Sequence, residues 1–323
     1  MKKALITGAQ GQDGSYLSEY LLSLGYQVFG LVRANSEVKE STRHLLGKVT
    51  YLYGDVRDEL SLRTAILKVW PDEIYNLAGQ VFVPISWQQS AETFDVNTGG
   101  LARLLKIVEE IKKEDTRIYQ ACTSEMFGNH EGACTEKSPM NPTSPYGISK
   151  LAAHKLAALY RERGLYVVSG ILFNHESPRR GQEMVTRKIV MAVAGWAKGD
   201  TTPLSLGYLD SRRDWGYAGE YVKVMQLMLQ QEHPQDYVYG TGESHSVREF
   251  LCAACHAAKL PMFYWQDLVK IDERFLRVQE IHDMRADNSK VTGWLGWKRE
   301  VNFDELVSMM VEAEMEKVKV AVA

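Results

Sequence analysis

The chain has 323 residues, of which 45% are hydrophobic and 24% charged, and its formal net charge is −3. This is ordinary globular composition, and the length suits one large domain or two smaller ones. The slightly acidic balance argues against a nucleic-acid-binding protein. No stretch approaches the roughly 18 consecutive apolar residues of a transmembrane helix. The apolar run after Met1 is too short for a signal peptide, so we expect a cytoplasmic protein without a membrane partner.

The first half of the chain alternates short apolar runs with amphipathic segments. The apolar runs predict strands at residues 4–7, 27–32, 49–53, 73–77, 117–121 and 166–172. Apolar residues at helical spacing predict helices at residues 15–24, 59–69, 97–111 and 146–163. Strands that alternate with helices form right-handed crossovers and a parallel sheet covered on both faces. We therefore expect an α/β fold with a doubly wound parallel sheet of the Rossmann type.

After Asn174 this rhythm breaks into shorter pieces punctuated by Gly and Pro. Helices are predicted at residues 219–230 and 247–258, and we expect both to return to the main sheet. The expected division is a Rossmann domain over residues 1–172, with returning segments near 219–258. Residues 173–323 are expected to form mainly a smaller carboxy-terminal lobe that binds the substrate.

The four cysteines contain one misleading motif. Cys252, Cys255 and His256 match the CxxCH pattern of c-type haem attachment. Their segment has helical periodicity, and haem attachment requires an export signal, which we do not expect here. We interpret the two thiols as small groups that pack a helix. Cys122 and Cys134 have no partner pair at ligand spacing, so no metal site is predicted.

A glycine-rich turn follows the first predicted strand and opens the first helix. It reads Gly8-Ala-Gln-Gly11-Gln-Asp-Gly14. Gly8 permits a tight turn, Gly11 lets the backbone approach a pyrophosphate, and Gly14 permits close packing of helix on strand. The amino terminus of the helix then faces the anion. In this context the turn predicts a dinucleotide site, in which Gln12 and Asp13 also take part.

The ends of the next strands carry the other expected cofactor contacts. Arg33 stands where an NAD enzyme usually has an acid for the ribose diol. A guanidinium binds a 2′-phosphate bidentately, so Arg33 favours NADP, although it can also be an ordinary surface charge. Asp55 and Val56 are placed to meet the adenine, and Leu77 and Ala78 to line a ribose.

Tyr146 and Lys150 are four residues apart, so on a helix they lie on one face about one turn from each other. The lysine ammonium favours the phenolate, which predicts a tyrosine pKa below its ordinary value of ~10. Such a pair accepts a proton from a sugar hydroxyl while hydride leaves the same carbon. Glu125 offers a second proton-transfer group, which a simple alcohol dehydrogenase does not need.

Together these motifs resemble the extended short-chain dehydrogenase/reductase family, and closely its GDP-mannose 4,6-dehydratase branch. The resemblance runs from Thr7 to Met315, nearly the whole chain. Besides the glycine turn, its most distinctive segments are Thr123-Ser-Glu125, Ser144-Pro-Tyr-Gly147, Phe173-Asn-His-Glu-Ser-Pro178 and Arg213-Asp-Trp-Gly216.

The resemblance implies an NADP-dependent dehydratase of a GDP-linked sugar. The catalytic set that it implies is Thr123, Glu125, Tyr146 and Lys150. The contacts to guanosine diphosphate that it implies are Asn174, Val185, Lys188, Arg213, Arg277 and Glu280. The three cations among them suit a diphosphate, and the carboxylate suits the amino edge of guanine.

Three segments depart from the family pattern. The run Val32-Arg33-Ala34-Asn35-Ser36 replaces the usual Arg-Arg-Ser-Ser, which grips the cofactor phosphate and bridges subunits, so homodimer and homotetramer both stay open. Residues 81–87 and 141–145 also differ and border the expected sugar site. The alternatives are therefore a dehydratase of another GDP-sugar such as GDP-manno-heptose, a nucleotide-sugar 4-epimerase or 4-reductase, and a non-catalytic dinucleotide sensor.

Overall fold

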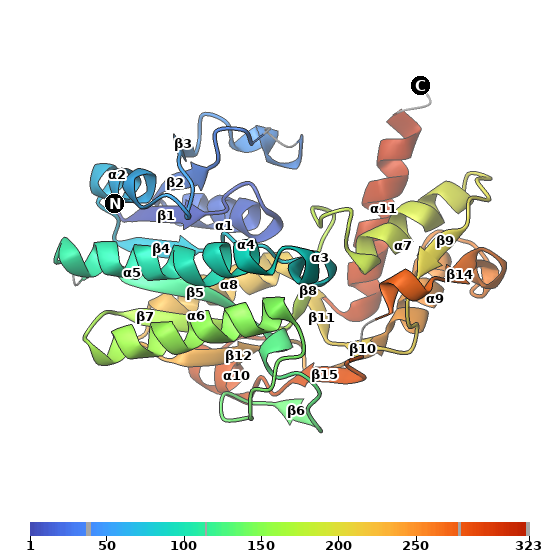
Figure 1. The fold of residues 1–323 in the computed structure, drawn as a ribbon. Coiled ribbons are helices and arrows are strands. Elements are labelled where there is room, and N and C mark those ends of the chain that lie inside the picture. Colours follow the sequence, from blue (N-terminus) through green and yellow to red (C-terminus); the bar gives the residue numbers. More distant parts are fainter. Residues whose placement is uncertain (37–39, 114, 277–278, 321–323) are drawn as a thin grey trace.

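The computed structural model describes residues 1–36, 40–113, 115–276 and 279–320. Within these residues a seven-stranded, all-parallel sheet forms the larger lobe, in the order β12-β7-β5-β4-β1-β2-β3 (Figure 1). Its strands are β1 (Lys3–Thr7), β2 (Gln27–Val32), β3 (Thr50–Tyr53), β4 (Glu73–Asn76), β5 (Arg117–Thr123), β7 (Val167–Leu172) and β12 (Asp236–Tyr239). The strand order reverses between β1 and β4, and ligands of such sheets bind at the carboxyl ends beside this point.

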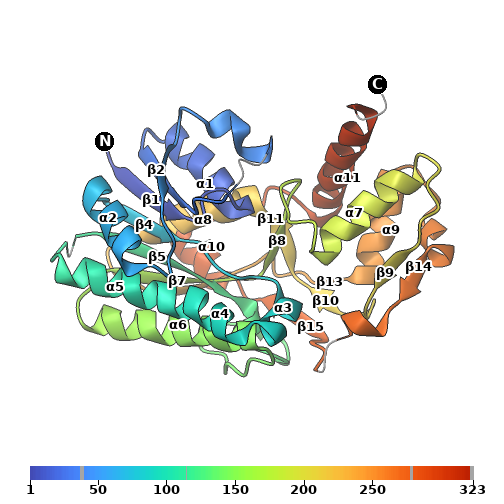
Figure 2. The same cartoon turned by 45° about the horizontal axis from the view of Figure 1, so that its top comes forward.

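Helices cover both faces of the sheet (Figures 1 and 2). One face carries α2 (Glu59–Val69), α5 (Gly100–Glu110) and α6 (Pro145–Glu162), and the other carries α1 (Gln12–Ser23), α8 (Ala218–Leu229) and α10 (Ser289–Leu295). Alternate residues of β1 enter the two cores: Ala4 and Ile6 pack with α1 and α8, whereas Leu5 packs with α2 and α5. A sheet buried on both faces explains why its strands read as continuous apolar runs.

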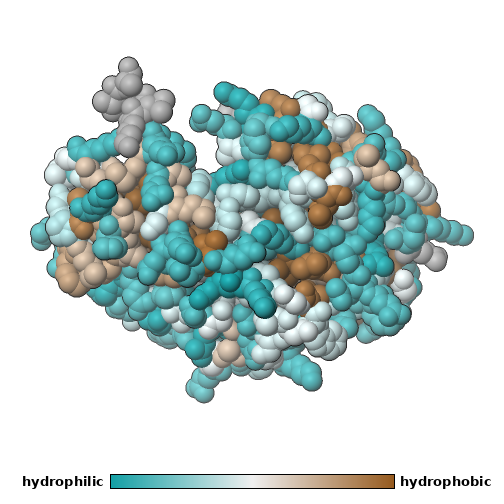
Figure 3. Space-filling view, turned by 180° about the vertical axis from the view of Figure 1, so that it is seen from behind, coloured by the Kyte–Doolittle hydropathy of each residue, from teal (hydrophilic) through white to brown (hydrophobic). Residues whose placement is uncertain are grey.

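The smaller lobe is built around three helices, α7 (Val185–Trp196), α9 (Val247–Ala257) and α11 (Phe303–Val320). Short strands complete it and join it to the main lobe: β6 (Ala133–Cys134), β8 (Asn174–Glu176), β9 (Leu204–Leu206), β10 (Arg212–Arg213), β11 (Trp215–Tyr217), β13 (His245–Ser246), β14 (Val269–Ile271) and β15 (Asp283–Ala286). Hydrophilic residues cover most of the face opposite to that of Figure 1, and hydrophobic residues form separate patches on it (Figure 3).

The structure confirms the expected fold class and corrects several element assignments. The helix predicted at residues 97–111 begins as a π-helical segment (Asp95–Gly99), continues as α5, and is preceded by α4 (Ser90–Phe94). Strand β12, which the sequence analysis did not predict, forms one edge of the main sheet. Helix α9 does not return to that sheet. Its apolar side packs in the smaller lobe, where Phe250 meets Trp215 edge-on.

The cysteines of the CxxCH motif lie on α9, as a packing role requires. Cys255 is buried in the core of the smaller lobe, and burial raises the pKa of its thiol to about 11. The described residues contain no group of three or more His, Cys, Asp or Glu side chains that could hold a metal ion. None of the helices described is both long enough and apolar enough for a bilayer crossing.

Candidate active site

The glycine turn between β1 and α1 fits a dinucleotide. Gly8 has φ +72°, and a Cβ there would lie 3.0 Å from the backbone nitrogen of Ala78. A Cβ at Gly14 would lie 2.4 Å from the carbonyl oxygen of Gly8, so the turn closes only without side chains at these positions. Gly11 is the N-cap of α1 and has no side chain to cap the helix. The first N–H groups of α1 therefore suit an anion such as a pyrophosphate.

The side chains of Gln12 and Asp13 join this turn to β8 of the smaller lobe. The Gln12 amide nitrogen donates to the carbonyl oxygen of His175 at 3.0 Å, and Ser177 donates to the Gln12 amide oxygen at 2.8 Å. Asp13 Oδ2 lies 2.9 Å from His175 Nε2. The structure thus shows these two side chains linking the lobes, and their contact with a cofactor stays a prediction.

His175 is largely buried beside a carboxylate. Its Nδ1 lies 2.8 Å from the carbonyl oxygen of Phe173, its Nε2 faces Asp13, and its ring stacks on Tyr221 with the ring centres 4.5 Å apart. Burial by itself would lower the pKa of His175, but the Asp13 carboxylate outweighs burial and raises it. Likewise, burial would raise the pKa of Asp13, but the imidazolium lowers it. Both shifts favour the charged forms, so the two side chains stabilise each other as an ion pair when His175 is protonated.

The residues expected to contact the adenine and its ribose follow the carboxyl ends of β2 and β3. Arg33 is exposed directly after β2. The Asp55 carboxylate accepts hydrogen bonds from Nε and Nη2 of the Arg57 guanidinium, which lower the pKa of Asp55, and the charge of Arg33 lowers it further. Val56 is buried against Gly100 in the core, so only its backbone can meet a cofactor.

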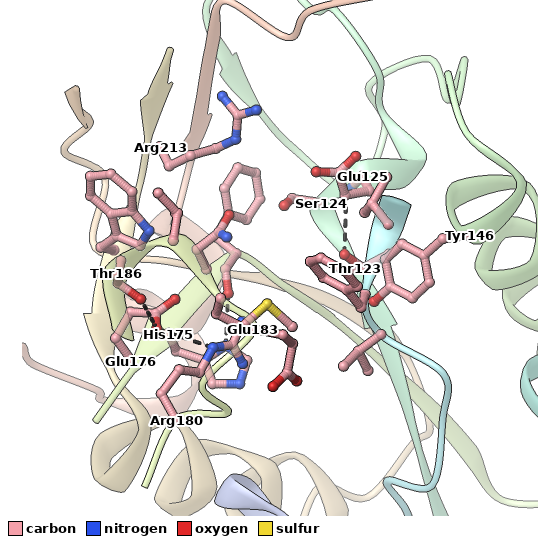
Figure 4. A pocket seen from close by; sticks show the side chains of 18 of the residues that line it. Thr123, Ser124, Glu125, Tyr146, His175, Glu176, Arg180, Glu183, Thr186 and Arg213 are labelled. Atoms are coloured by element: carbon pink, nitrogen blue, oxygen red, sulfur yellow. Dashed lines mark hydrogen bonds and ion pairs between the residues drawn. The ribbon is translucent and has the colours of Figure 1, made fainter. Parts of the chain in front are cut away.

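A cavity of about 300 Å³ lies between the lobes, beside the carboxyl ends of β5 and β7 (Figure 4). It brings together the four catalytic candidates and five of the six predicted nucleotide contacts: Thr123, Glu125, Tyr146, Lys150, Asn174, Val185, Lys188, Arg213 and Glu280. The sixth, Arg277, lies outside the described residues. Asp13 and Leu77 from the cofactor set line the same cavity.

Short-range hydrogen bonds and a helix cap position the catalytic candidates. Thr123 ends β5 and accepts a hydrogen bond at 3.3 Å from the backbone N–H of Glu125, which lies in a short 3-10 turn. Ser144 caps α6 by accepting from the N–H of Gly147 at 3.1 Å, with a proline at the first helical position. A Cβ at Gly147 would lie 2.9 Å from the carbonyl oxygen of Glu125. The glycine therefore lets the helix that bears Tyr146 approach the segment that bears Glu125.

The electrostatics of Tyr146 differ from the prediction. Burial raises the pKa of Tyr146, and the Glu125 carboxylate raises it further, while a hydrogen bond to Thr123 and the charge of Arg180 lower it. Lys150 donates to the carbonyl oxygen of Ala121 at 2.9 Å, and burial lowers the pKa of this lysine. The expected tyrosine pKa below the ordinary value was wrong for the protein alone, because desolvation outweighs the hydrogen bond to Thr123 and the charge of Arg180.

The cavity residues predicted to contact the nucleotide come from the smaller lobe. Arg213 is buried, and its Nη1 donates to the carbonyl oxygens of Arg212 and Ile281 at 2.8 Å each. Its Nη2 lies 3.7 Å from the Glu280 carboxylate, which also accepts from Ser211 at 2.7 Å. The ammonium of Lys188 stands 4.5 Å from the centre of the exposed Phe275 ring.

Three charged cavity residues, Glu176, Arg180 and Glu183, were not among the predicted site residues, although Glu176 lies in the segment Phe173–Pro178 that the sequence analysis singled out. Arg180 Nε lies 3.1 Å from a carboxylate oxygen of Glu176, and Thr186 donates to the same oxygen at 2.6 Å (Figure 4). Glu183 also lines this wall. Together with His175, these residues face the wall formed by Thr123, Glu125 and Tyr146.

A model of the family described as GDP-mannose 4,6 dehydratase matches residues 5–310. The chain belongs to this family. It is 45% identical to GDP-mannose 4,6 dehydratase 1 of Arabidopsis thaliana, over 98% of this chain and 91% of the relative. Identity to the GDP-mannose 4,6 dehydratase of Homo sapiens is 42%, over 97% and 91%. These matches confirm the resemblance stated from the sequence and show that the chain is an enzyme of the GDP-mannose 4,6-dehydratase family.

Solved structures confirm the fold. The UDP-glucose 4-epimerase of Thermus thermophilus, in complex with NAD, superposes with a TM-score of 0.84 at 26% identity, covering 97% of this chain and 98% of that chain. The fold is therefore the one shared by nucleotide-sugar epimerases and dehydratases.

Proposed function

We propose that the chain converts GDP-mannose to GDP-4-keto-6-deoxymannose with loss of water, using bound NADP. One observation carries this proposal: Glu125 and Tyr146 come from separate elements and meet on one wall of the cavity (Figure 4). A 4-epimerase needs no second acid–base group after the ketone forms, whereas a dehydratase does. Glu125 is that second group.

The residues of the larger lobe suit the cofactor. The turn at Gly8, Gly11 and Gly14 would receive the pyrophosphate and Arg33 the 2′-phosphate, with the adenine and ribose contacts at Asp55, Val56, Leu77 and Ala78. When bound, NADP would supply the hydride acceptor for C4 of the sugar and, once reduced, the hydride donor for C6.

Tyr146 takes the proton of the sugar O4 as the C4 hydride leaves, and Thr123 hydrogen-bonds the same oxygen. Because burial raises the pKa of Tyr146, its phenolate needs positive charge nearby. Lys150 and Arg180, which line the same cavity, supply that charge.

Glu125 then removes the C5 proton, which the neighbouring 4-ketone has made acidic. The same carboxyl group returns a proton to the C6 hydroxyl, and that oxygen leaves as water. The double bond between C5 and C6 accepts the hydride at C6 and a proton at C5, which completes the 4-keto-6-deoxy sugar. Hydride lost from C4 thus reappears at C6, so no cofactor is consumed.

The smaller lobe suits the nucleotide. Lys188, Arg213 and Arg277 would neutralise the diphosphate, and Glu280 would accept hydrogen bonds from the amino edge of guanine. Asn174 and Val185 would complete the site. In this division residues 1–172 mainly bind the cofactor and residues 173–323 mainly bind the sugar nucleotide. We expect the enzyme to act as a homodimer or homotetramer.

The test is to incubate the purified protein with GDP-mannose and no added cofactor, and to follow the product by mass spectrometry. Loss of one water supports the proposal, and an isomer of unchanged mass points to a 4-epimerase. Residues 81–84, part of a segment that departs from the family pattern, line the cavity. An unreacted mixture would therefore direct the search to another GDP-sugar such as GDP-manno-heptose.

A further inference from the structure

Three buried polar side chains stand side by side on adjacent strands: Thr7 and Asn76 are the last residues of β1 and β4, and Gln120 lies within β5. Thr7 pairs with Asn76 in the sheet register, and Asn76 pairs with Gln120. At most 4% of the surface of each residue is exposed. Buried polar groups are costly unless they are hydrogen-bonded. The three side chains form a chain of hydrogen bonds in which each donates to the next, from the glycine turn toward Lys150.

The direction of this chain follows from its first member. Thr7 Oγ1 accepts the backbone N–H groups of Leu77 at 3.1 Å and Ala78 at 3.0 Å. Its own proton therefore points to the Asn76 amide oxygen, 2.8 Å away. This orients the Asn76 amide so that its nitrogen donates to the Gln120 amide oxygen at 2.7 Å. The Asn76 amide therefore has one orientation that satisfies its partners.

The chain ends on the carbonyl oxygen that holds Lys150. The amide nitrogen of Gln120 donates to the carbonyl oxygen of Ala121 at 2.9 Å, and the Lys150 ammonium donates to the same oxygen at 2.9 Å. The ladder between β4 and β5 ends at Asn76 and Gln120, one residue before this carbonyl. A carbonyl oxygen has two lone pairs. Because Gln120 takes one of them, the ammonium is confined to the direction of the other.

We propose that Gln120 is a positioning residue for the dehydratase reaction. Held by Thr7 and Asn76, it fixes the ammonium of Lys150 in the direction that serves Tyr146. The same chain fixes the backbone of Leu77 and Ala78 against the glycine turn, so one set of bonds aligns the cofactor edge and the acid–base pair. The kinetic part of this inference rests on the proposed function.

The first experiment detects the chain without turnover. In uniformly ¹⁵N-labelled protein, the side-chain amide protons of Asn76 should exchange slowly with water, because they are buried and bonded. Gln120→Met removes their acceptor and should speed this exchange. Gln226→Met is the matched control, because Gln226 is a buried glutamine on α8 that bonds Tyr26 at 3.4 Å, outside the cavity. If the Asn76 amide protons exchange at the wild-type rate in Gln120→Met, the proposed chain of hydrogen bonds does not exist.

The second experiment is a double-mutant cycle with Lys150→Met. Gln120→Met should lower kcat on GDP-mannose by about tenfold or more with little change in KM, because a misplaced catalytic group affects the reaction and not substrate binding. In the Lys150→Met background the same change should cost less than about twofold, because its target is gone. If the two fold-decreases in kcat multiply in the double variant, or if Gln120→Met raises KM and leaves kcat unchanged, the proposal is contradicted.

A second variant covers the case in which Gln120→Met does not fold. Gln120→Glu keeps the side-chain shape and the acceptor for Asn76, but replaces the donor to Ala121 by an oxygen. It should reproduce the loss of kcat, and a wild-type kcat would overturn the proposal. If the wild-type protein leaves GDP-mannose unchanged, the proposed function fails, while the amide exchange still decides whether the chain of hydrogen bonds exists.

Discussion

Replacing Asp13 by Asn should destabilise the protein by an amount that depends on pH. The substitution keeps the shape of the side chain and removes the charge 2.9 Å from His175 Nε2. The two side chains are 12% exposed for His175 and 23% for Asp13. Exposed ion pairs contribute less than about 1 kcal/mol, and losing one partner of a fully buried pair costs about 3 to 5 kcal/mol. For this partly buried pair we expect Asp13→Asn to lower the free energy of unfolding by about 2 kcal/mol.

The sign of the pH dependence follows from the two pKa shifts. Because the pKa of His175 is raised by folding, its contribution to stability is fully present below about pH 6.5 and is lost as the pH rises through the folded value. Because the pKa of Asp13 is lowered, its contribution is present above about pH 4 and is lost as the pH falls through the folded value. The deficit of Asp13→Asn should therefore be greatest between about pH 4 and pH 6.5.

Urea unfolding followed by circular dichroism at mildly acidic and at alkaline pH measures this deficit. Asp115→Asn is the matched control, because Asp115 also pairs with a cation, Lys113 at 3.1 Å, but its side chain is 79% exposed. The control substitution should lower the free energy of unfolding by less than about 1 kcal/mol. A deficit of Asp13→Asn that is equal at both pH values, or no larger than that of the control, would refute the reasoning.

Three further substitutions test the site. Tyr146→Phe should lower kcat by ~10² or more with an unchanged circular dichroism spectrum, and near wild-type turnover would remove Tyr146 from the mechanism. Glu125→Gln should retain C4 oxidation, seen as absorbance of reduced nicotinamide, but nearly abolish water loss, and an unimpaired dehydration rate would exclude Glu125 as the base. In Gly14→Ala the new Cβ would lie 2.7 Å from Ala9 Cα, so the turn must shift and NADP affinity measured by calorimetry should fall; wild-type affinity would show that the turn does not hold the cofactor.

Local patterns predicted the features that depend on neighbours in sequence. The glycine turn, the helix that bears Tyr146 and most strands of the main sheet follow from spacing and residue type, and the structure has them close to the expected positions. Helix α9 was recognised as a helix but assigned to the wrong core. Its apolar side suits a sheet or another helix equally, and only the folded chain shows that Trp215 covers it.

Features that join distant parts of the chain escaped prediction. His175 lies 162 residues from its partner Asp13, and nothing local marks the pair. Likewise, the spacing of Tyr146 and Lys150 predicted that they share a helix face, but not the burial that reverses the expected shift in the pKa of Tyr146. Desolvation is a property of the packed cavity, so it becomes visible only once both lobes are in place.

In the proposed mechanism, hydride leaves C4 and returns to C6 of the same sugar within one cavity. The most direct measurement uses GDP-mannose deuterated at C4, without added cofactor, and locates the label in the product by NMR. The mechanism predicts a dehydrated product with deuterium at C6. Deuterium that stays at C4, or that is lost to solvent, would contradict it.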